Sequence, residues 1–225
     1  MKRGMIKWGI ALLVAGLFFT TACIKDSDYS LGKFWLSYGV IKGQSGNLNV
    51  RLDDGTILYP ILSNQPFLTS YTTDRLLVNY TILGNKIENG DTNYIVKINA
   101  IDRLLKKSVT KLTKQNADSL GRDPVDAKNF WFGNGFLNVN FAFKQEFKIH
   151  LINLAKDTIQ PTTGEISLLL LHNAWGDNQM NERSGFVSFD LNSLLNGKDS
   201  VKIIVKSKDY LGASHEFKGT YKKEQ

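Results

Sequence analysis

Apolar and polar residues alternate along most of the chain after Phe34, with Gly, Asn and Asp between the alternating runs. A period of two residues is typical of a half-buried β-strand, whereas an amphipathic helix repeats every 3.6 residues. The clearest run is 47–52, where Leu48, Val50 and Leu52 alternate with polar residues. We therefore predict an all-β protein, with a single short helical turn near 193–196.

Five strands are predicted in the first half of the chain, at 34–40, 47–52, 57–61, 75–83 and 94–105. We expect Asp53-Asp54-Gly55 to join the second to the third, because Asp-Gly accepts the positive φ of a tight hairpin. This turn already explains the neighbouring carboxylates Asp53 and Asp54, which we do not assign to catalysis. Five strands within about 70 residues is the strand count of a small closed barrel such as the OB-fold. We place this barrel at 33–110.

The alternation stops between Lys106 and Lys128, where Lys, Asp, Asn, Ser, Gly and Pro dominate. This composition predicts a domain boundary, and we place a linker at 111–128. The lysines of this stretch indicate a solvated face rather than a phosphate-binding site.

Six further strands are predicted in 129–225, at 137–144, 146–154, 166–171, 185–191, 201–206 and 217–221. The first of them alternates strongly, and we expect the second to pair with it. The run 166–171 is apolar throughout, which is typical of a central strand covered on both faces. Two layers with this strand spacing predict an antiparallel, immunoglobulin-like β-sandwich.

The first residues of the chain have the pattern of an export signal. Three basic residues precede an apolar run from Trp8 to Phe19: Lys2, Arg3 and Lys7. That run is too short to span a bilayer, which takes about 20 residues. Ala22 then satisfies the small-residue requirement of a signal peptidase, so 1–22 is predicted to be a signal peptide. Cys23 directly after this junction resembles the lipobox of bacterial lipoproteins, although Thr20 stands where the lipobox usually has an aliphatic residue.

Cys23 is the only cysteine in the 225 residues, so it cannot form an intrachain disulfide. A free thiol is a liability in an oxidising compartment, and acylation would remove it. We expect Cys23 to anchor the protein to a membrane, because more than one acyl chain gives stable attachment. The alternative is an ordinary secretion site beside a chance cysteine.

Residues 23–32 are predicted to be a lipidated tether. The polar, partly acidic run 24–28 resembles the signal that takes Bacteroidetes lipoproteins to the outer face of the outer membrane; a plain solvated linker is the alternative. We therefore expect a cell-envelope protein, lipid-anchored at the outer membrane and exposed at the surface.

Charge gives no sign of nucleic-acid binding. The net charge of +7 falls to +4 without the signal peptide, with 25 basic against 21 acidic residues. This mild excess, on an exported chain, predicts no nucleic-acid partner.

Catalytic and metal-binding patterns are also missing from the sequence. His150 alternates onto the face of Lys148 and is predicted to be solvated, His172 ends the buried apolar run, and His215 lies in a loop. Asp177, five residues after His172, is the one carboxylate near ligand spacing. No Gly-x-Ser-x-Gly elbow is present. We predict no catalytic residue, metal or cofactor.

Aromatic residues near strand ends and Gly-rich loops are the better candidates for binding: Trp35, Trp131, Phe132, Phe136 and Trp175. Such rings can stack on a sugar or dock a protein, and core packing is the alternative. We select Trp131, Phe132 and Trp175 as candidate contacts with a ligand or partner.

Several motifs together resemble one family. They are Leu52-Asp53-Asp54-Gly55, Phe136-Leu137-Asn138-Val139-Asn140-Phe141, His150-Leu151-Ile152-Asn153-Leu154, Leu171-His172-Asn173-Ala174 with Gly176-Asp177, and Gly185-Phe186-Val187-Ser188-Phe189-Asp190-Leu191. With the lipobox, they are similar to those of the NigD-like lipoproteins of Bacteroidetes. The resemblance implies an N-terminal OB domain, a C-terminal β-sandwich and, from the bacteriocin gene cluster that gave the family its name, an immunity role. It implies no functional residue.

Two functions therefore stay open. The first is a non-enzymatic envelope protein that binds a protein or small ligand, as in bacteriocin immunity. The second is a glycan-binding accessory lipoprotein that uses the loops around Trp131 and Trp175. A hydrolase is a distant third.

Overall fold

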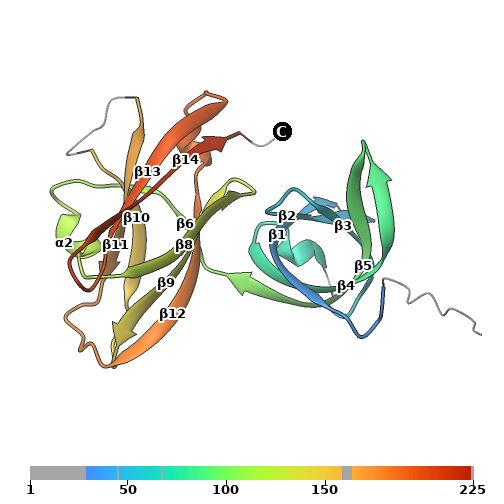
Figure 1. Cartoon of the computed structure of the whole chain (residues 1–225), viewed down its shortest axis with the longest axis horizontal. Coiled ribbons are helices and arrows are strands. Elements are labelled where there is room, and N and C mark those ends of the chain that lie inside the picture. Colours follow the sequence, from blue (N-terminus) through green and yellow to red (C-terminus); the bar gives the residue numbers. More distant parts are fainter. Residues whose placement is uncertain (1–28, 45, 67, 159–163, 224–225) are drawn as a thin grey trace, which may run out of the picture.

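The computed structural model describes residues 29–44, 46–66, 68–158 and 164–223, which form two β-domains side by side (Figure 1). Cys23 and the signal peptide lie outside the described residues. Among the described residues, no helix is long and apolar enough to cross a membrane. The all-β prediction, with a barrel followed by a sandwich, is confirmed.

The first domain is a closed barrel with the strand order β1-β2-β3-β5-β4. Its strands are β1 (Trp35–Gln44), β2 (Asn47–Leu52), β3 (Ile57–Ser63), β4 (Arg75–Glu88) and β5 (Asp91–Leu104), with a short 3₁₀ helix, η2 (Leu68–Tyr71), before β4. Only the β3–β5 pair of this barrel is parallel. Alternate residues of each strand fill the interior, as the periodicity requires.

The predicted hairpin between β2 and β3 is confirmed. Gly55 has φ +91°, the Leu52 N–H donates to the Thr56 carbonyl at 2.9 Å, and the Gly55 N–H donates to the Leu52 carbonyl at 3.0 Å. Phe34 and Leu36, at the start of the first strand, are 61% and 57% exposed. Residues of opposite parity in β1, such as Trp35 and Ile41, pack on the core instead.

The second domain is a sandwich of two sheets with the orders β14-β13-β11-β10-β7 and β6-β12-β9-β8. The strands are β6 (Lys106–Ser108), β7 (Thr110–Lys111), β8 (Asp126–Gly133), β9 (Phe136–Gln145), β10 (Leu151–Lys156), β11 (Ile166–Asn173), β12 (Asn181–Asp190), β13 (Ser200–Lys208) and β14 (Ser214–Lys222). Among the described strands, β6–β12, β7–β10 and β11–β13 pair in parallel and the others are antiparallel.

The sandwich core lies between the two sheets and includes Leu137, Val187 and Phe189, which are fully buried. Strand β11 is covered on both faces, as predicted, since Leu168 packs in this core and Leu171 packs under the short helix α2 (Ala117–Leu120). A second short helix, α3 (Asn192–Leu195), lies at the predicted helical turn.

The predicted strand at 146–154 is wrong at its start and in its partner. Residues 146–150 form a bend, and β10 begins at Leu151. It then pairs with β11 in the other sheet rather than with β9. A bend at this point lets the chain cross from one layer of the sandwich to the other, which an uninterrupted strand would prevent.

The junction between the domains differs from the predicted linker. β5 ends at Leu104 and β6 begins at Lys106, so one residue separates the barrel from the sandwich. β6 and β7 then add an edge to each sheet of the sandwich. Within the predicted linker, Leu112 and Val125 are 2% and 1% exposed. The segment is therefore part of the second domain's packing.

Arg75, the first residue of β4, is fully buried where the barrel meets the sandwich. Its guanidinium forms an ion pair with Asp53 of the barrel, and its Nε donates to Ser188 Oγ at 3.1 Å and to Asn138 Oδ1 at 3.3 Å in the sandwich. Asn138 is fully buried where it accepts this bond. The cation therefore bonds to groups of both domains.

Asp53 is the matching carboxylate at this interface. It accepts hydrogen bonds from Trp131 Nε1 at 2.8 Å, Asn134 Nδ2 at 2.9 Å and Asn138 Nδ2 at 3.1 Å, all in the sandwich. The Asp53 side chain also lies against the backbone of Gly133, because a Cβ added there would lie 2.4 Å from Asp53 Cγ. The hairpin turn thus positions an interdomain anchor as well as reversing the chain.

Candidate functional site

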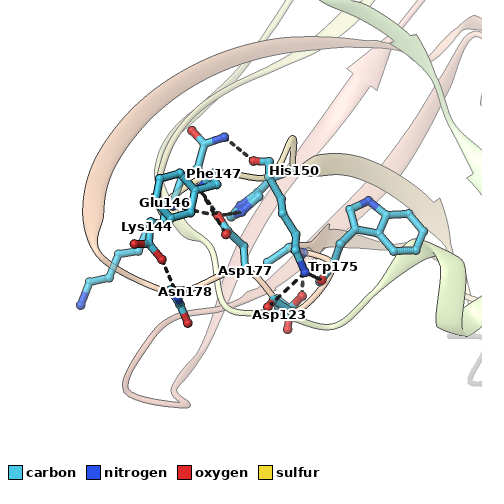
Figure 2. A network of polar contacts seen from close by, with 12 residues as sticks. Asp123, Lys144, Glu146, Phe147, His150, Trp175, Asp177 and Asn178 are labelled. Atoms are coloured by element: carbon cyan, nitrogen blue, oxygen red, sulfur yellow. Dashed lines mark hydrogen bonds and ion pairs between the residues drawn. The ribbon is translucent and has the colours of Figure 1, made fainter.

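The carboxylate of Asp177 organises two loops at one end of the sandwich (Figure 2). It accepts the backbone N–H groups of Glu146 at 2.7 Å and Phe147 at 3.2 Å, and it contacts His150 Nε2 at 3.1 Å. Its side chain is only 3% exposed. The loop that follows β11 reaches this position through Trp175 and Gly176, which both have positive φ, at 52° and 66°.

Further hydrogen bonds tie the same two loops together. Lys148 Nζ donates to the carbonyl oxygens of Trp175 at 2.7 Å and Gly176 at 3.4 Å. The amide of Asn178 donates to the Glu146 carboxylate. These bonds run in both directions between the loops, so the loops form one unit.

His150 and His172 extend the network inward from Asp177. His150 Nδ1 lies 2.9 Å from His172 Nε2, and His172 Nδ1 lies 2.7 Å from the Pro124 carbonyl oxygen. The His150 side chain is 4% exposed and His172 is 2% exposed. The ring of Phe143 covers both imidazoles, with centroid distances of 5.2 and 5.7 Å. Asp177, His150, His172 and Pro124 therefore form one buried hydrogen-bonded chain.

This environment shifts the acidity of two of its groups. Burial alone would raise the pKa of the Asp177 carboxyl, but hydrogen bonds from the backbone of 146–148 and from His150 hold that pKa well below its usual range. Burial lowers the pKa of His172, opposed by its hydrogen bond to Pro124, and the neighbouring His150 lowers it further. Near neutral pH, Asp177 is thus a carboxylate and His172 is neutral.

The sequence prediction for His150 is wrong, since the residue is buried and not solvated. The prediction extended the strand alternation through 146–150, where the chain bends. The sequence signal for this network is Asp177, five residues after His172, although that spacing by itself indicates only a weak metal-ligand pattern. Among the described residues, no group of three or more His, Cys, Asp or Glu side chains could hold a metal ion.

Large apolar side chains project to solvent from these cross-linked loops and their ends. Their exposed fractions are high: Phe147 84%, Ile149 81%, Met180 69% and Trp175 50%. We call these four residues the loop face. Because the two loops that carry these exposed apolar side chains are joined by hydrogen bonds, the loop face is a candidate interaction site.

Of the three aromatic residues selected from the sequence, the structure places only Trp175 in the loop face. Trp131 is half-buried at the domain interface, 5.2 Å from the Tyr38 ring and 5.8 Å from the Phe186 ring. Phe132, on the same strand, packs between the sheets against Phe217 and Tyr221.

Comparison with known proteins finds matches for both domains. The family described as "NigD-like N-terminal OB domain" matches residues 40–104, and "NigD-like C-terminal beta sandwich domain" matches residues 108–221. No curated protein matches the chain.

Three crystal structures show the same two-domain fold. A putative toxin-related protein from Parabacteroides distasonis is 31% identical, with 84% of this chain and 94% of that chain covered and a TM-score of 0.69. A NigD-like immunity protein from Bacteroides caccae is 24% identical, with 87% and 99% covered and a TM-score of 0.61. A putative lipoprotein from Bacteroides fragilis is 9% identical, with 84% and 98% covered and a TM-score of 0.52.

Proposed function

Because the chain belongs to the NigD-like family, we propose that it is a non-enzymatic envelope protein that binds a partner protein through the loop face. The observation that carries this proposal is the loop face itself. Phe147, Ile149 and Trp175 are exposed, while the polar groups beneath them are bonded to one another. Such a surface offers apolar contact area on loops whose positions are already fixed. Both properties favour binding of a partner protein.

The same arrangement is poorly suited to catalysis. The imidazoles of His150 and His172 are buried, and each ring nitrogen already contacts a protein atom. A general base must reach the proton that it abstracts from a substrate, and these groups have no such access. Their role is to hold the loops in place.

For the partner, we propose a protein toxin of the bacteriocin class, with an immunity role for this chain. Similarity to proteins described as toxin-related and as a NigD-like immunity protein supports this choice. An immunity protein acts by binding, and the loop face provides the surface for it.

The test is a strain that lacks the gene, challenged with purified bacteriocins active against its relatives. We expect greater sensitivity, restored resistance with the wild-type gene, and no restoration with the double variant Phe147→Ser, Trp175→Ser. Leu211→Ser is the matched control, because Leu211 is 94% exposed on the β13–β14 turn. Unchanged sensitivity of the deletion strain would contradict the immunity role. Equal rescue by all variants would contradict the loop face.

A glycan is the alternative partner, and Trp175 is the aromatic residue of the loop face that could stack on a sugar ring. The mature protein would then bind oligosaccharides on an array, and Trp175→Ala would abolish that binding while Leu211→Ser would not. Absence of any glycan binding leaves the protein partner as the proposal.

We further propose that lipid on Cys23 holds the protein at the cell envelope, in the outer membrane and exposed at the surface. The sequence before residue 29 supports this, as does similarity to a putative lipoprotein. Cys23→Ala should abolish incorporation of labelled fatty acid and release the protein from the membrane fraction. Protease treatment of intact cells should degrade the wild-type protein if it faces outward.

A further inference from the structure

The buried chain from Pro124 to Asp177 contains three successive hydrogen bonds. They join the Pro124 carbonyl to His172, His172 to His150, and His150 to Asp177. Each hydrogen bond needs one proton. Two neutral imidazoles carry one N–H proton each, so a neutral pair can supply only two of the three.

The order of donors follows from the two ends of the chain. The Pro124 carbonyl can only accept, so His172 Nδ1 carries a proton. A neutral His172 then accepts at Nε2, which makes His150 Nδ1 a donor. His150 Nε2 is left facing the Asp177 carboxylate at 3.1 Å. Without a proton on Nε2, two lone pairs would face each other in a buried site.

The third proton lies on an imidazole and not on the Asp177 carboxyl. Asp177 accepts backbone N–H groups from Glu146 and Phe147, which stabilise its ionised form. The lowered pKa values of Asp177 and His172 agree with a carboxylate and a neutral His172. This leaves His150 as the group that is doubly protonated.

We propose that the histidine pair holds one extra proton, carried on His150 and paired with Asp177, and that this proton locks the loop face. When the proton leaves at higher pH, His150 no longer bonds to Asp177, and the anchor of 146–150 loosens. The loop face is then an alkaline-sensitive binding surface. This consequence for binding rests on the proposed function, whereas the proton assignment does not.

Other charged groups around the pair are already engaged. The Lys148 ammonium bonds to carbonyls of the Trp175 loop, and the Glu146 carboxylate bonds to Asn178. Asp123, from the segment before β8, accepts the Ala174 N–H at 2.7 Å and favours a cationic His172 electrostatically. On the β9 side the pair meets the uncharged ring of Phe143. Asp177 is therefore the carboxylate bonded to the pair.

Acid acts on the pair by a different route. A second proton would create two buried cations with ring nitrogens 2.9 Å apart and would remove the acceptor at His172 Nε2. Burial and like charge both oppose that step, so the folded protein resists a proton that the unfolded chain accepts, and stability falls as the pH drops below neutrality. The lock is therefore most stable near neutral pH and opens as the pH rises.

Nitrogen-15 NMR of the histidine side chains in the mature protein, in detergent micelles, tests the proton assignment directly. Near neutral pH we expect both ring nitrogens of His150 to be protonated and His172 to be the neutral tautomer with its proton on Nδ1. His215 is the internal reference, because its side chain is 59% exposed. A neutral His150 at neutral pH would overturn the proposal.

Asp177→Asn removes the negative charge with which the extra proton is paired. The Glu146 N–H and His150 Nε2 both contact Oδ2 of Asp177, at 2.7 and 3.1 Å, so the amide oxygen can take that place but has no charge to stabilise a cationic His150. We expect His150 to become neutral at neutral pH in this variant. A doubly protonated His150 in Asp177→Asn would contradict the assignment. Asp209→Asn, which alters the partner of His215, should leave His150 unchanged.

Hydrogen exchange at the Glu146 and Phe147 amides tests the lock. From about pH 6 to about pH 9, we expect their protection factors to fall about tenfold in the wild-type protein and to stay constant in Asp177→Asn. Constant protection in both proteins would overturn the lock even if the proton assignment holds. Neither measurement uses a partner, so failure of the proposed binding function would be seen separately, in the challenge assay.

Discussion

Two buried networks of polar contacts among the described residues differ in the basic group that they contain. Between the domains, the cation is the guanidinium of Arg75, which stays protonated at every physiological pH. Under the loop face, the basic groups are the imidazoles of His150 and His172, and histidine is the side chain that can change its charge within the physiological pH range. If His150 carries the proposed extra proton, the network between the domains keeps its charge across the physiological pH range, while the network under the loop face responds to pH.

The two networks also differ in what they connect. Arg75 and Asp53 bond to side chains of both domains, so their loss would separate two folded units. Asp177 and His150 connect two loops of a single domain. Damage to the first network should therefore affect the whole molecule, and damage to the second should stay local. The following experiments are ordered from the largest expected effect to the smallest.

Arg75→Met should cause the largest loss of stability. It leaves the largely buried Asp53 carboxylate without its cation, and breaking a buried ion pair on one side costs about 3–5 kcal/mol. The measurement is the free energy of unfolding in urea. Arg103→Met is the control, because Arg103 pairs with Asp74 at the surface, where an ion pair contributes about 0–1 kcal/mol. Similar losses of unfolding free energy in both variants would show that the buried interdomain ion pair contributes no more to stability than an exposed one.

Asp177→Ala should have the next largest effect. It removes the acceptor for two backbone N–H groups and for His150, so the two loops lose the carboxylate that joins them. Asp209→Ala is the control, since that carboxylate also accepts backbone N–H groups but in an exposed turn. We expect the Asp177 variant to lose protection from hydrogen exchange at 146–150 while the barrel keeps its own. Loss of protection in the barrel would contradict the separation of the two networks.

Gly133→Ala should loosen the domain interface without removing a charge. The added Cβ would lie 2.4 Å from Asp53 Cγ, and overpacking of this kind costs about 1–3 kcal/mol. Gly84→Ala is the matched control in a barrel strand, because no atom lies within 4 Å of its added Cβ. The comparison of their unfolding midpoints isolates the contact between the domains. Equal unfolding midpoints for the two variants would mean that the interface accommodates the added methyl group at little cost in stability.

The pH dependence of stability should show the smallest effect and the sharpest contrast. If the folded protein binds one more proton than the unfolded chain, its stability falls as pH rises above neutrality, by at most about 1.4 kcal/mol per pH unit. Arg75→Met should keep this slope, because it leaves His150 and Asp177 in place. Asp177→Asn should lose it. The same slope in both variants would place the titrating group elsewhere.

Local pattern predicted most of the fold. The residues Leu76, Val78, Tyr80 and Ile82 alternate in sequence, and all four are buried in the barrel. The Asp53-Asp54-Gly55 turn was predictable because positive φ at Gly55 is a local property. What the sequence could not show is that the same Asp53 meets Arg75, 22 residues away, and the side chains of a second domain.

The candidate site was harder to predict for the same reason. His150 and Asp177 are 27 residues apart, and they meet only because β9 and β12 pair and bring their loops together. The alternation of apolar and polar residues predicted a solvated His150. The pattern does not show that the chain bends at 146–150, which changes the side chains that point inward. Trp175 was selected from its loop position, which needs no long-range knowledge. Trp131 and Phe132 also lie beside Gly-rich sequence. Only the tertiary fold shows that both pack against other aromatic rings.

The junction at Leu105 has one further consequence. A single residue separates β5 from β6, and even its carbonyl accepts the Ser188 N–H at 2.9 Å. Proteases cleave extended, unpaired backbone, and linkers between domains are their usual target. Between its two domains, this chain has almost no extended, unpaired backbone that a protease could cleave. A protease would therefore cut this protein at its exposed loops before it could divide the molecule into separate domains.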